Sequence, residues 1–431
     1  MKQQTSFIWF LLIIGSIFFM NTCSLFDTNQ DDESDRLTHE DITLELVDID
    51  EPDMYSTSSA STRLNRAVKP VPGDVSIVLR ATVVPPKASD GASLQASHVA
   101  LSPDGKYAFV SYMLQGEAVY GALDIFDVSN PSWPVIISTN SFPAIDISTV
   151  LYDGSYVYIG GQSIDETGEG NSAYIRALKF TGNKLATTDT IIERSLPGYF
   201  TTDIATTDNA VYVTTGTNNA AGTLAVGIYV FKTGTLDDTM DITPVTANLP
   251  DVRSITATNK NIAIFEAKFE APAADAALLV YDTNLDLDLV QTIPLDVTVL
   301  PESKAGLGYI GNYFVLAANR SGTVVIDPDL STPVVTTIPA PNLESIDAAN
   351  QSSNSVSTGT ANSKTIYFIS NGESGLWVGD SDSISTTDDW GISGTIRFGE
   401  GQSVNYAAAK NSVVVAAVGI GGLKIMELVS P

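Results

Sequence analysis

The sequence predicts an all-β fold, and within that class a seven-bladed β-propeller of four-stranded antiparallel blades. Three observations lead to this prediction. Residues that favour strands and turns, such as Val, Thr, Ser, Asn and Gly, are abundant, while runs of helix-favouring residues are scarce. A pair of strand-like segments recurs seven times, and the strand that the last repeat lacks is found ahead of the first.

The amino terminus reads as a signal peptide spanning residues 1–22. A positive charge at Lys2 is followed by a fourteen-residue apolar run at 7–20, which is shorter than the roughly 20 residues that a membrane-spanning helix needs. Cys23, the only cysteine, comes directly afterwards, and FMNTC resembles a bacterial lipobox, although Asn21 and Thr22 depart from its usual small residues. We therefore predict lipid attachment at Cys23; the alternative is an uncleaved short anchor helix.

Residues 23–73 are predicted to be an acidic, Ser/Thr-rich flexible tether. The segment is poor in large apolar residues, so it offers little burial to offset the entropy lost on ordering. Within it, residues 42–49 (ITLELVDI) alternate well enough to form a short strand docked on the main domain. The domain itself is expected to span residues 74–431.

Two sets of strand-like segments recur at intervals of about 50 residues, which is typical of a four-stranded propeller blade. The first set begins at residues 107, 156, 210, 262, 313, 366 and 413 (YAFVS, YVYIG, AVYVT, IAIFE, YFVLA, IYFIS and VVVAA). The second set begins at residues 123, 175, 228, 278, 323, 376 and 423 (LDIFD, IRALK, IYVFK, LLVYD, TVVID, LWVGD and LKIME). Gly- and Asp-containing turns precede members of the first set, so each unit is a meander.

The first and last repeats predict how the ring of blades closes. Six repeats continue into a further β-prone run, but the seventh reaches the end of the sequence soon after residues 423–427. A blade without an outer strand would expose an unpaired edge. Residues 76–84 (SIVLRATVV) precede the first complete repeat and have the character of the missing strand. We therefore expect this segment to complete the last blade.

The first blade carries a family resemblance. Residues 105–112 (GKYAFVSY) and 121–139 (GALDIFDVSNPSWPVIIST) are similar to the LVIVD-repeat β-propellers, bacterial secreted or lipid-anchored proteins, and residues 322–338 and 419–428 match more weakly. The resemblance implies a propeller over residues 74–431. It implies no particular activity, because this family has none in common and a fold does not specify a function.

The charge balance excludes one class of partner. Asp and Glu number 50 against 22 Lys and Arg, which gives a formal net charge of -28 at pH 7. Such a chain repels nucleic acid, so no nucleic-acid binding is expected.

No residue is predicted to be catalytic. A Ser/His/Asp triad would depend on His98, because the other histidine, His39, lies in the predicted tether, and the count of Cys and His excludes a zinc site of that type. The turn at 102–107 (SPDGKY) is interpreted as a plain hairpin. The acidic segment 282–288 (DTNLDLD) resembles a calcium loop only superficially, so no cofactor is predicted and calcium remains an open alternative.

The innermost strand of each propeller blade lines the central channel, and the segments just before the YAFVS-type strands should supply it. Each segment offers one polar residue, which gives the predicted channel-mouth set His98, Asp146, Asp203, Arg253, Lys304, Asp347 and Asn405. These side chains either converge on a polar ligand or are simply hydrated. The long loops at 162–173, 215–226 and 350–363 are the alternative site.

Two classes of function remain open. The first is a lipid-anchored binding or interaction module for a protein, glycan or small polar ligand; the second is a metal-dependent hydrolase or lactonase that uses channel carboxylates. We expect a monomer located in the bacterial cell envelope and attached as an outer-membrane lipoprotein. The propeller faces either the periplasm or the cell surface, and the sequence leaves both orientations open.

Overall fold

The computed structural model describes residues 33–47, 75–116, 118–164, 171–182, 184–217, 227–232, 246–247, 251–267, 276–283, 287–300, 303–380 and 391–430. The chain divides into two compact units, Met1–Asp35 and Arg36–Pro431, and the first is described only where α1 (Glu33–Arg36) begins. No helix in the described part of the chain is long and apolar enough to span a membrane. Cys23 and the apolar run at 7–20 lie outside the described residues.

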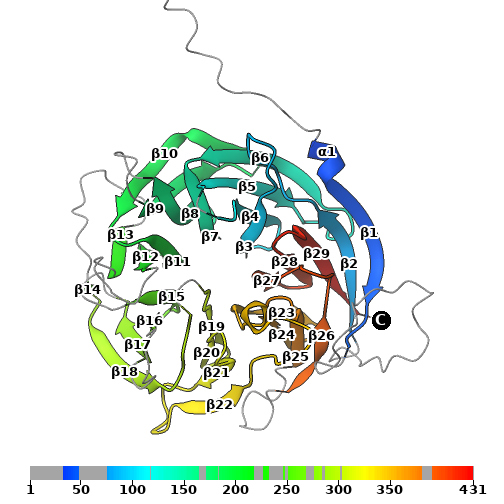
Figure 1. Cartoon of the computed structure of the whole chain (residues 1–431). Helices are drawn as coiled ribbons and strands as arrows, with labels where there is room; N and C mark the ends of the chain where they lie inside the picture. Colours follow the sequence, from blue (N-terminus) through cyan, green and yellow to red (C-terminus); the bar gives the residue numbers. More distant parts are fainter. Residues whose placement is uncertain are drawn as a thin grey trace, which may run out of the picture. The chain divides into compact units, whose positions relative to one another are not determined.

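The second unit is a ring of seven antiparallel sheets, so the predicted seven-bladed propeller is confirmed (Figure 1). The innermost strands of blades one to seven are β3 (Gln95–Leu101), β7 (Ile145–Tyr152), β11 (Phe200–Thr206), β15 (Val252–Ala257), β19 (Leu307–Ile310), β23 (Ser355–Ala361) and β27 (Tyr406–Lys410). The second strands are β4 (Tyr107–Met113), β8 (Tyr156–Ile164), β12 (Ala210–Gly216), β16 (Asn261–Glu266), β20 (Tyr313–Ala317), β24 (Lys364–Ser370) and β28 (Val413–Ala417).

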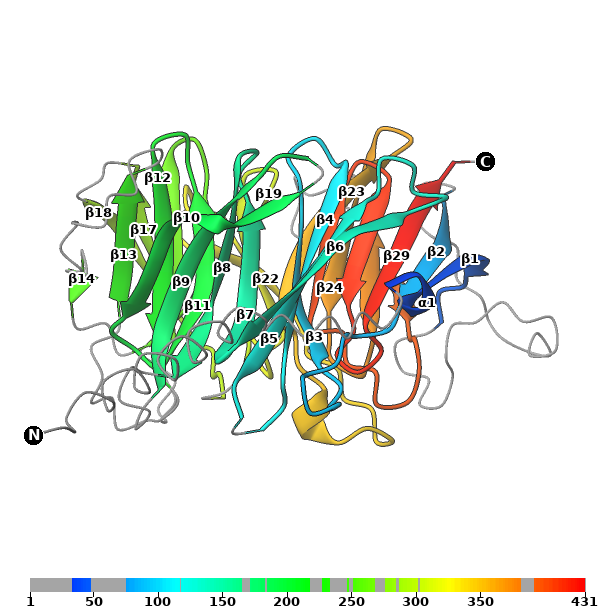
Figure 2. The same ribbon diagram turned by 90° about the horizontal axis from the view of Figure 1, so that it is seen from above.

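The outer half of each blade follows the same order. The third strands are β5 (Tyr120–Asp127), β9 (Asn171–Phe180), β13 (Gly227–Lys232), β17 (Ala276–Asp282), β21 (Thr323–Ile326), β25 (Leu376–Asp380) and β29 (Leu423–Val429). The outer strands are β6 (Val135–Pro143), β10 (Leu185–Leu196), β14 (Thr246–Ala247), β18 (Leu289–Leu295), β22 (Val334–Ile338) and β26 (Ile392–Ile396), with β2 (Ser76–Val83) in blade seven. Figure 2 shows the blades from the side, with their strands running between the two faces of the ring.

The hydrophobic core is divided among the boundaries between blades. Seven clusters of buried apolar side chains are described, and each joins two neighbouring blades. The second strand of a blade is therefore buried on both faces: all seven residues of β12 are buried. A sheet with two apolar faces needs a neighbour on each side, and a closed ring provides both.

Blade seven is closed by an amino-terminal strand, as expected. β2 pairs antiparallel with β29, in a register that runs from Ser76 opposite Val429 to Val83 opposite Leu423. The carboxy-terminal strand therefore gains a partner for its backbone N–H and C=O groups, which an open blade would have left unpaired.

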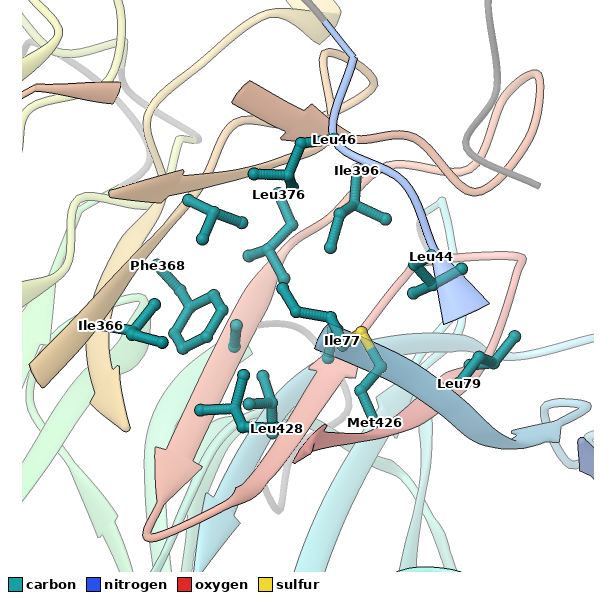
Figure 3. Packing of buried hydrophobic residues seen from close by; sticks show 14 of the residues in the cluster. Leu44, Leu46, Ile77, Leu79, Ile366, Phe368, Leu376, Ile396, Met426 and Leu428 are labelled. Atoms are coloured by element: carbon teal, nitrogen blue, oxygen red, sulfur yellow. The ribbon is translucent and has the colours of Figure 1, made fainter. Parts of the chain in front are cut away.

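A fifth strand, β1 (Leu37–Leu44), lies outside β2, and this corrects the predicted tether of residues 23–73. The sequence predicted a strand at 42–49, but the observed one begins at Leu37. Leu44 and Leu46 are buried in the cluster between blades six and seven (Figure 3). Val47 pairs with Thr395 of β26. Local composition placed the start of this strand too late, because residues 37–41 are mostly polar and are held by pairing with β2. Residues 48–73 lie outside the described residues.

Candidate functional site

Two cavities lie at opposite ends of the central channel. The wide cavity, of about 1170 Å³, is lined by the residues with which the innermost strands begin, and the narrow cavity, of about 390 Å³, by those with which they end. His98, Asp203 and Tyr406 line both. These three residues therefore lie at the boundary between the two cavities.

Every blade places one polar residue at an equivalent point on the wall of the wide cavity. In blades one to four this residue is the extra residue of a β-bulge in the innermost strand, and in blades six and seven it immediately precedes that strand. We call the set the polar ring: Ser97, Ser148, Thr202, Arg253, Lys304, Asn354 and Asn405. β-bulges re-aim a side chain, which fits their recurrence at this position.

The polar ring joins neighbouring blades by hydrogen bonds. In five blades the ring side chain donates to the carbonyl of the residue that precedes the ring residue of the next blade. The donor and acceptor pairs are Ser97 to Ile147 at 2.6 Å, Ser148 to Thr201 at 2.7 Å, Arg253 to Ser303 at 3.2 Å, Asn354 to Val404 at 3.3 Å and Asn405 to Ala96 at 2.8 Å. Each such bond contributes about 1 kcal/mol. The ring therefore holds the wall of the cavity in place as well as lining it.

Lys304 is a ring residue that reaches across the channel. From blade five, its Nζ donates to the carbonyl of Ser97 in blade one and, at 3.3 Å, to that of Ser148 in blade two. Burial lowers the pKa of Lys304 to about 8, while the negative charge of Asp203 opposes this shift. The Lys304 ammonium therefore hydrogen-bonds to backbone carbonyls on the opposite wall of the channel.

Asp203 lies one residue after the ring position of blade three. Its carboxylate accepts the N–H of Ile204 at 2.8 Å and the N–H of Ile255 in blade four at 3.2 Å. Burial raises its pKa to about 7, although both backbone bonds and the charge of Lys304 act in the opposite direction. Asp203 is therefore a carboxyl group that changes protonation near neutral pH.

His98 lies one residue after the ring position of blade one. Its Nδ1 accepts the N–H of Val150 at 3.4 Å, and its ring lies against that of Tyr406, with the centroids 3.7 Å apart and the planes tilted by 33°. Burial, and then the charge of Lys304, hold the pKa of His98 well below its usual value, so the imidazole is neutral and carries its hydrogen on Nε2. This Nε2 has no hydrogen-bond partner among the described residues.

Two aspartates, Asp146 and Asp251, precede ring residues by two positions and link blades together. Asp146 accepts the N–H groups of Tyr120 at 3.0 Å and Leu114 at 3.4 Å, both in blade one. Asp251, which the sequence did not single out, accepts the N–H of Thr217 in blade three at 3.0 Å. Burial raises the pKa of each carboxyl to about 6. Both aspartates therefore link neighbouring blades by hydrogen bonds.

Arg253 is buried and its guanidinium is engaged on several sides. It forms an ion pair with Asp251, donates to the carbonyl of Thr217 at 3.1 Å and lies 5.3 Å from the ring centroid of Phe200. Together with its bond to the Ser303 carbonyl, these contacts make Arg253 a part of the wall.

The structure places six of the seven predicted channel residues on the wall of the wide cavity, and Asp347 is the exception. Asp347 is exposed and caps the 3₁₀ helix η1 (Ala348–Asn350), where it accepts the N–H of Ala349 at 2.9 Å. Asn354 holds the ring position of blade six. It stands 50 residues after Lys304 and 51 before Asn405, a spacing that would have identified it.

Two amide side chains on this wall have unpaired polar atoms. Asn319 is fully buried, and neither its Oδ1 nor its Nδ2 has a hydrogen-bond partner among the described residues; the same holds for the Nε2 of Gln162. Asn319 has a φ of 53°, and glycines hold the equivalent turn positions of blades six and seven, Gly372 at 60° and Gly419 at 50°. The backbone there needs a left-handed residue, and the sequence did not point to Asn319.

The described residues contain no group of three or more His, Cys, Asp or Glu side chains that could hold a metal ion. Of the calcium-like segment 282–288, residues 284–286 lie outside the described residues. The segment 102–107 forms the turn between β3 and β4, where Ser102 donates to Asp104 at 2.7 Å. The three loops that the sequence offered as an alternative site differ. Residues 165–170 and 218–226, in the first two loops, lie outside the described residues, whereas Asn350, Ser352 and Asn354 of the third loop line the wide cavity.

Comparison with known proteins gives no family. No family model and no curated protein matches the sequence. Among solved structures, the chain is similar to the computationally designed Ika8 protein, with 12% identity, 78% of this chain and 96% of that chain covered, and a TM-score of 0.44. It is also similar to a chain of a Mitotic Checkpoint Complex structure, with 9% identity, 77% and 89% coverage and a TM-score of 0.47. The resemblance to LVIVD-repeat propellers stays a prediction.

Proposed function

We propose that this protein is a binding module of the bacterial cell envelope, held at the membrane by lipid on Cys23, and that its ligand occupies the wide cavity. The observation that carries the proposal is the convergence of all seven blades on one cavity of about 1170 Å³. Concave sites with a few convergent polar groups are the usual binding sites of proteins, and a propeller fold suits a binding or interaction module.

The wall of the wide cavity supports this function because it is held rigid before any ligand arrives. Polar-ring bonds cross five of the seven blade boundaries, and Lys304 crosses the channel. A site whose side chains are already fixed loses little conformational entropy on binding, which favours affinity. The metal-dependent hydrolase has no such support, because no described cluster of carboxylates favours it.

The proposal is tested by blocking one opening at a time. Ala349 is exposed and lines the wide cavity, so Ala349→Trp adds bulk there without entering the core. Lys410 is exposed and lines the narrow cavity, so Lys410→Trp is the matched control. The full-length protein and both variants are screened against small polar metabolites by thermal shift, because a ligand that binds the folded state raises the melting temperature.

We expect at least one compound to raise the melting temperature of the unaltered protein and of Lys410→Trp, but not that of Ala349→Trp. A compound that acts equally on all three proteins, or a screen without any such compound, would show that the wide cavity is not the binding site.

A further inference from the structure

Three large apolar side chains are exposed on the outside of the propeller where the ring closes. Val84 is 55% exposed, Trp133 is 60% exposed and Val135 is 48% exposed. They lie beside the start of β1: Val84 donates its N–H to the carbonyl of Arg36 at 2.9 Å, and Trp133 stacks on His39 with the ring centroids 3.7 Å apart. We call these three residues the closure rim.

The closure rim lies where the chain enters the propeller. β1 follows Arg36 directly, and only twelve residues, 24–35, separate Arg36 from Cys23. A segment of this length spans at most about 45 Å even when it is fully extended. If Cys23 carries lipid, the chain therefore keeps this side of the ring close to the bilayer surface.

A second group of exposed apolar side chains lies on the far side of the ring. It includes Leu289 and Val290 of β18 and Val334 of β22. β18 and β22 lie opposite β1 and β2 in the ring (Figure 1). An anchor that joins the propeller at Arg36 therefore brings the closure rim, and not this second group, to the membrane.

The side chains of the closure rim suit a lipid surface. Tryptophan is enriched at membrane–water interfaces because its ring is amphipathic, and exposed apolar patches commonly mark membrane or protein contacts. Three side chains alone would bind a bilayer weakly, but an anchor makes the contact intramolecular and so raises its effective concentration. The net charge of -28 disfavours anionic lipid, so the surface that fits is zwitterionic.

We infer that the closure rim rests on the surface of a zwitterionic membrane, with Val84, Trp133 and Val135 in contact with lipid. This inference rests on the proposed function, because it needs the lipid on Cys23. The rim belongs to the outer edge of the ring, beside β1, β2 and β6 (Figure 1). The propeller therefore stands on its edge, and the wide cavity opens along the membrane rather than into it.

The test places a fluorescent label on either side of the ring. Cys23 is the only cysteine, and its thiol is blocked if it carries lipid, so an introduced cysteine is the only residue labelled. Val84→Cys labels the closure rim. Val290→Cys is the matched control, because it replaces a valine that is 61% exposed on the opposite side.

Each full-length, lipid-anchored protein carries a polarity-sensitive dye and is reconstituted into vesicles of phosphatidylethanolamine and phosphatidylcholine. The acyl chains are either unmodified or brominated near the headgroup, and bromine quenches only a dye that it contacts. We expect brominated lipid to reduce the emission of the label at Val84 and to leave the label at Val290 unchanged. Trp133→Ser, added to Val84→Cys, should diminish the loss of emission because it removes the largest apolar side chain of the rim.

Other results overturn the inference while the proposed function stands. An equal loss with and without Trp133 would mean that the anchor alone holds Val84 at the surface. Equal losses at Val84 and Val290 would show that no side of the ring is preferred. If brominated lipid reaches neither label while the protein stays on the vesicles, the rim is bare or is covered by a second copy of the chain.

The unaltered protein separates these results from a failure of the proposed anchor. It should take no label and should sediment with the vesicles. If Cys23 takes the label and the protein stays in solution, the lipid anchor is wrong, and the inference falls with it.

Discussion

Arg36 forms an ion pair with Asp124, a residue of β5 in blade one whose side chain is completely buried. One guanidinium nitrogen, Nη1, also donates to Thr139 at 3.1 Å, and Nε donates to the carbonyl of Val84 at 3.0 Å. Arg36 immediately precedes β1, which is added to blade seven. The contact therefore ties blade one to the strand added outside blade seven, at the boundary where the ring closes.

Replacing Arg36 should destabilise the protein strongly. Arg36→Ala leaves the Asp124 carboxylate buried without its cation, which typically costs about 3–5 kcal/mol of unfolding free energy. Urea denaturation measures the change. The double variant Arg36→Ala with Asp124→Asn is the control, because it removes the buried charge and should recover part of the loss. A loss below about 1 kcal/mol in the single variant would mean that the pair does not stabilise the closure.

Two amino-terminal deletions should differ in stability. Deleting residues 1–35 keeps Arg36 and β1, whereas deleting 1–47 removes both, together with buried Leu44 and Leu46. Each buried leucine contributes about 1.5–3 kcal/mol, so we expect a lower melting temperature only for the longer deletion. Scanning calorimetry compares the two proteins. Equal melting temperatures would contradict the assignment of β1 to the propeller.

Stability should fall as the pH rises from about 4 to 7, in part because of Asp203. Burial raises the pKa of this carboxyl to about 7, so the folded protein holds its proton more tightly than the unfolded chain does. The stabilisation is fully present below the unfolded pKa and is lost as the pH rises through the folded value, by at most about 1.4 kcal/mol for each pH unit. The raised pKa values of Asp146 and Asp251 act in the same direction. The lowered pKa of His98 acts in the opposite direction, because below about pH 6.5 the unfolded chain takes up a proton that the folded protein does not.

Asp203→Asn has no carboxyl to titrate, so its stability should change less across this window than that of the unaltered protein. The measurement is the free energy of unfolding in urea at a series of pH values from 4 to 7. Lys304 does not obscure the comparison, because its lowered pKa of about 8 lies above the window. An equal slope in both proteins would show that Asp203 has a normal pKa.

Cys23→Ser should release the protein from the membrane. If Cys23 carries diacylglycerol, its two chains supply about 0.8 kcal/mol for each buried methylene, and the substitution removes all of it. We expect the variant in the soluble fraction after ultracentrifugation, with an unchanged melting temperature because Cys23 precedes the propeller. A variant that stays in the membrane fraction would contradict the lipoprotein prediction.

The number of blades and the way the ring closes could be predicted from the sequence alone. Alternating apolar residues and turn glycines are local features of the sequence. Because they recur at intervals of about 50 residues, the number of recurrences gives the number of blades. The missing strand of the last repeat led to residues 76–84, now β2. The repeat pattern also identified six of the seven predicted residues, Lys304 and Asn405 among them, as residues near the central channel, and the structure places them on the wall of the wide cavity. This was possible because the residues just before a strand recur at the same interval as the strand itself.

Which residues depend on partners far away along the chain is apparent only in the folded ring. The sequence predicted a docked strand at 42–49 but not the start of β1 at Leu37, because that start lies in an acidic, mostly polar segment whose partner is β2 of blade seven. The sequence pointed to Asp347 because a surface 3₁₀ helix precedes β23, and nothing local distinguishes the cap of that helix from a channel residue. The unpaired amide of Asn319 could not be foreseen at all: whether a polar atom has a partner depends on every residue that surrounds it in the folded ring.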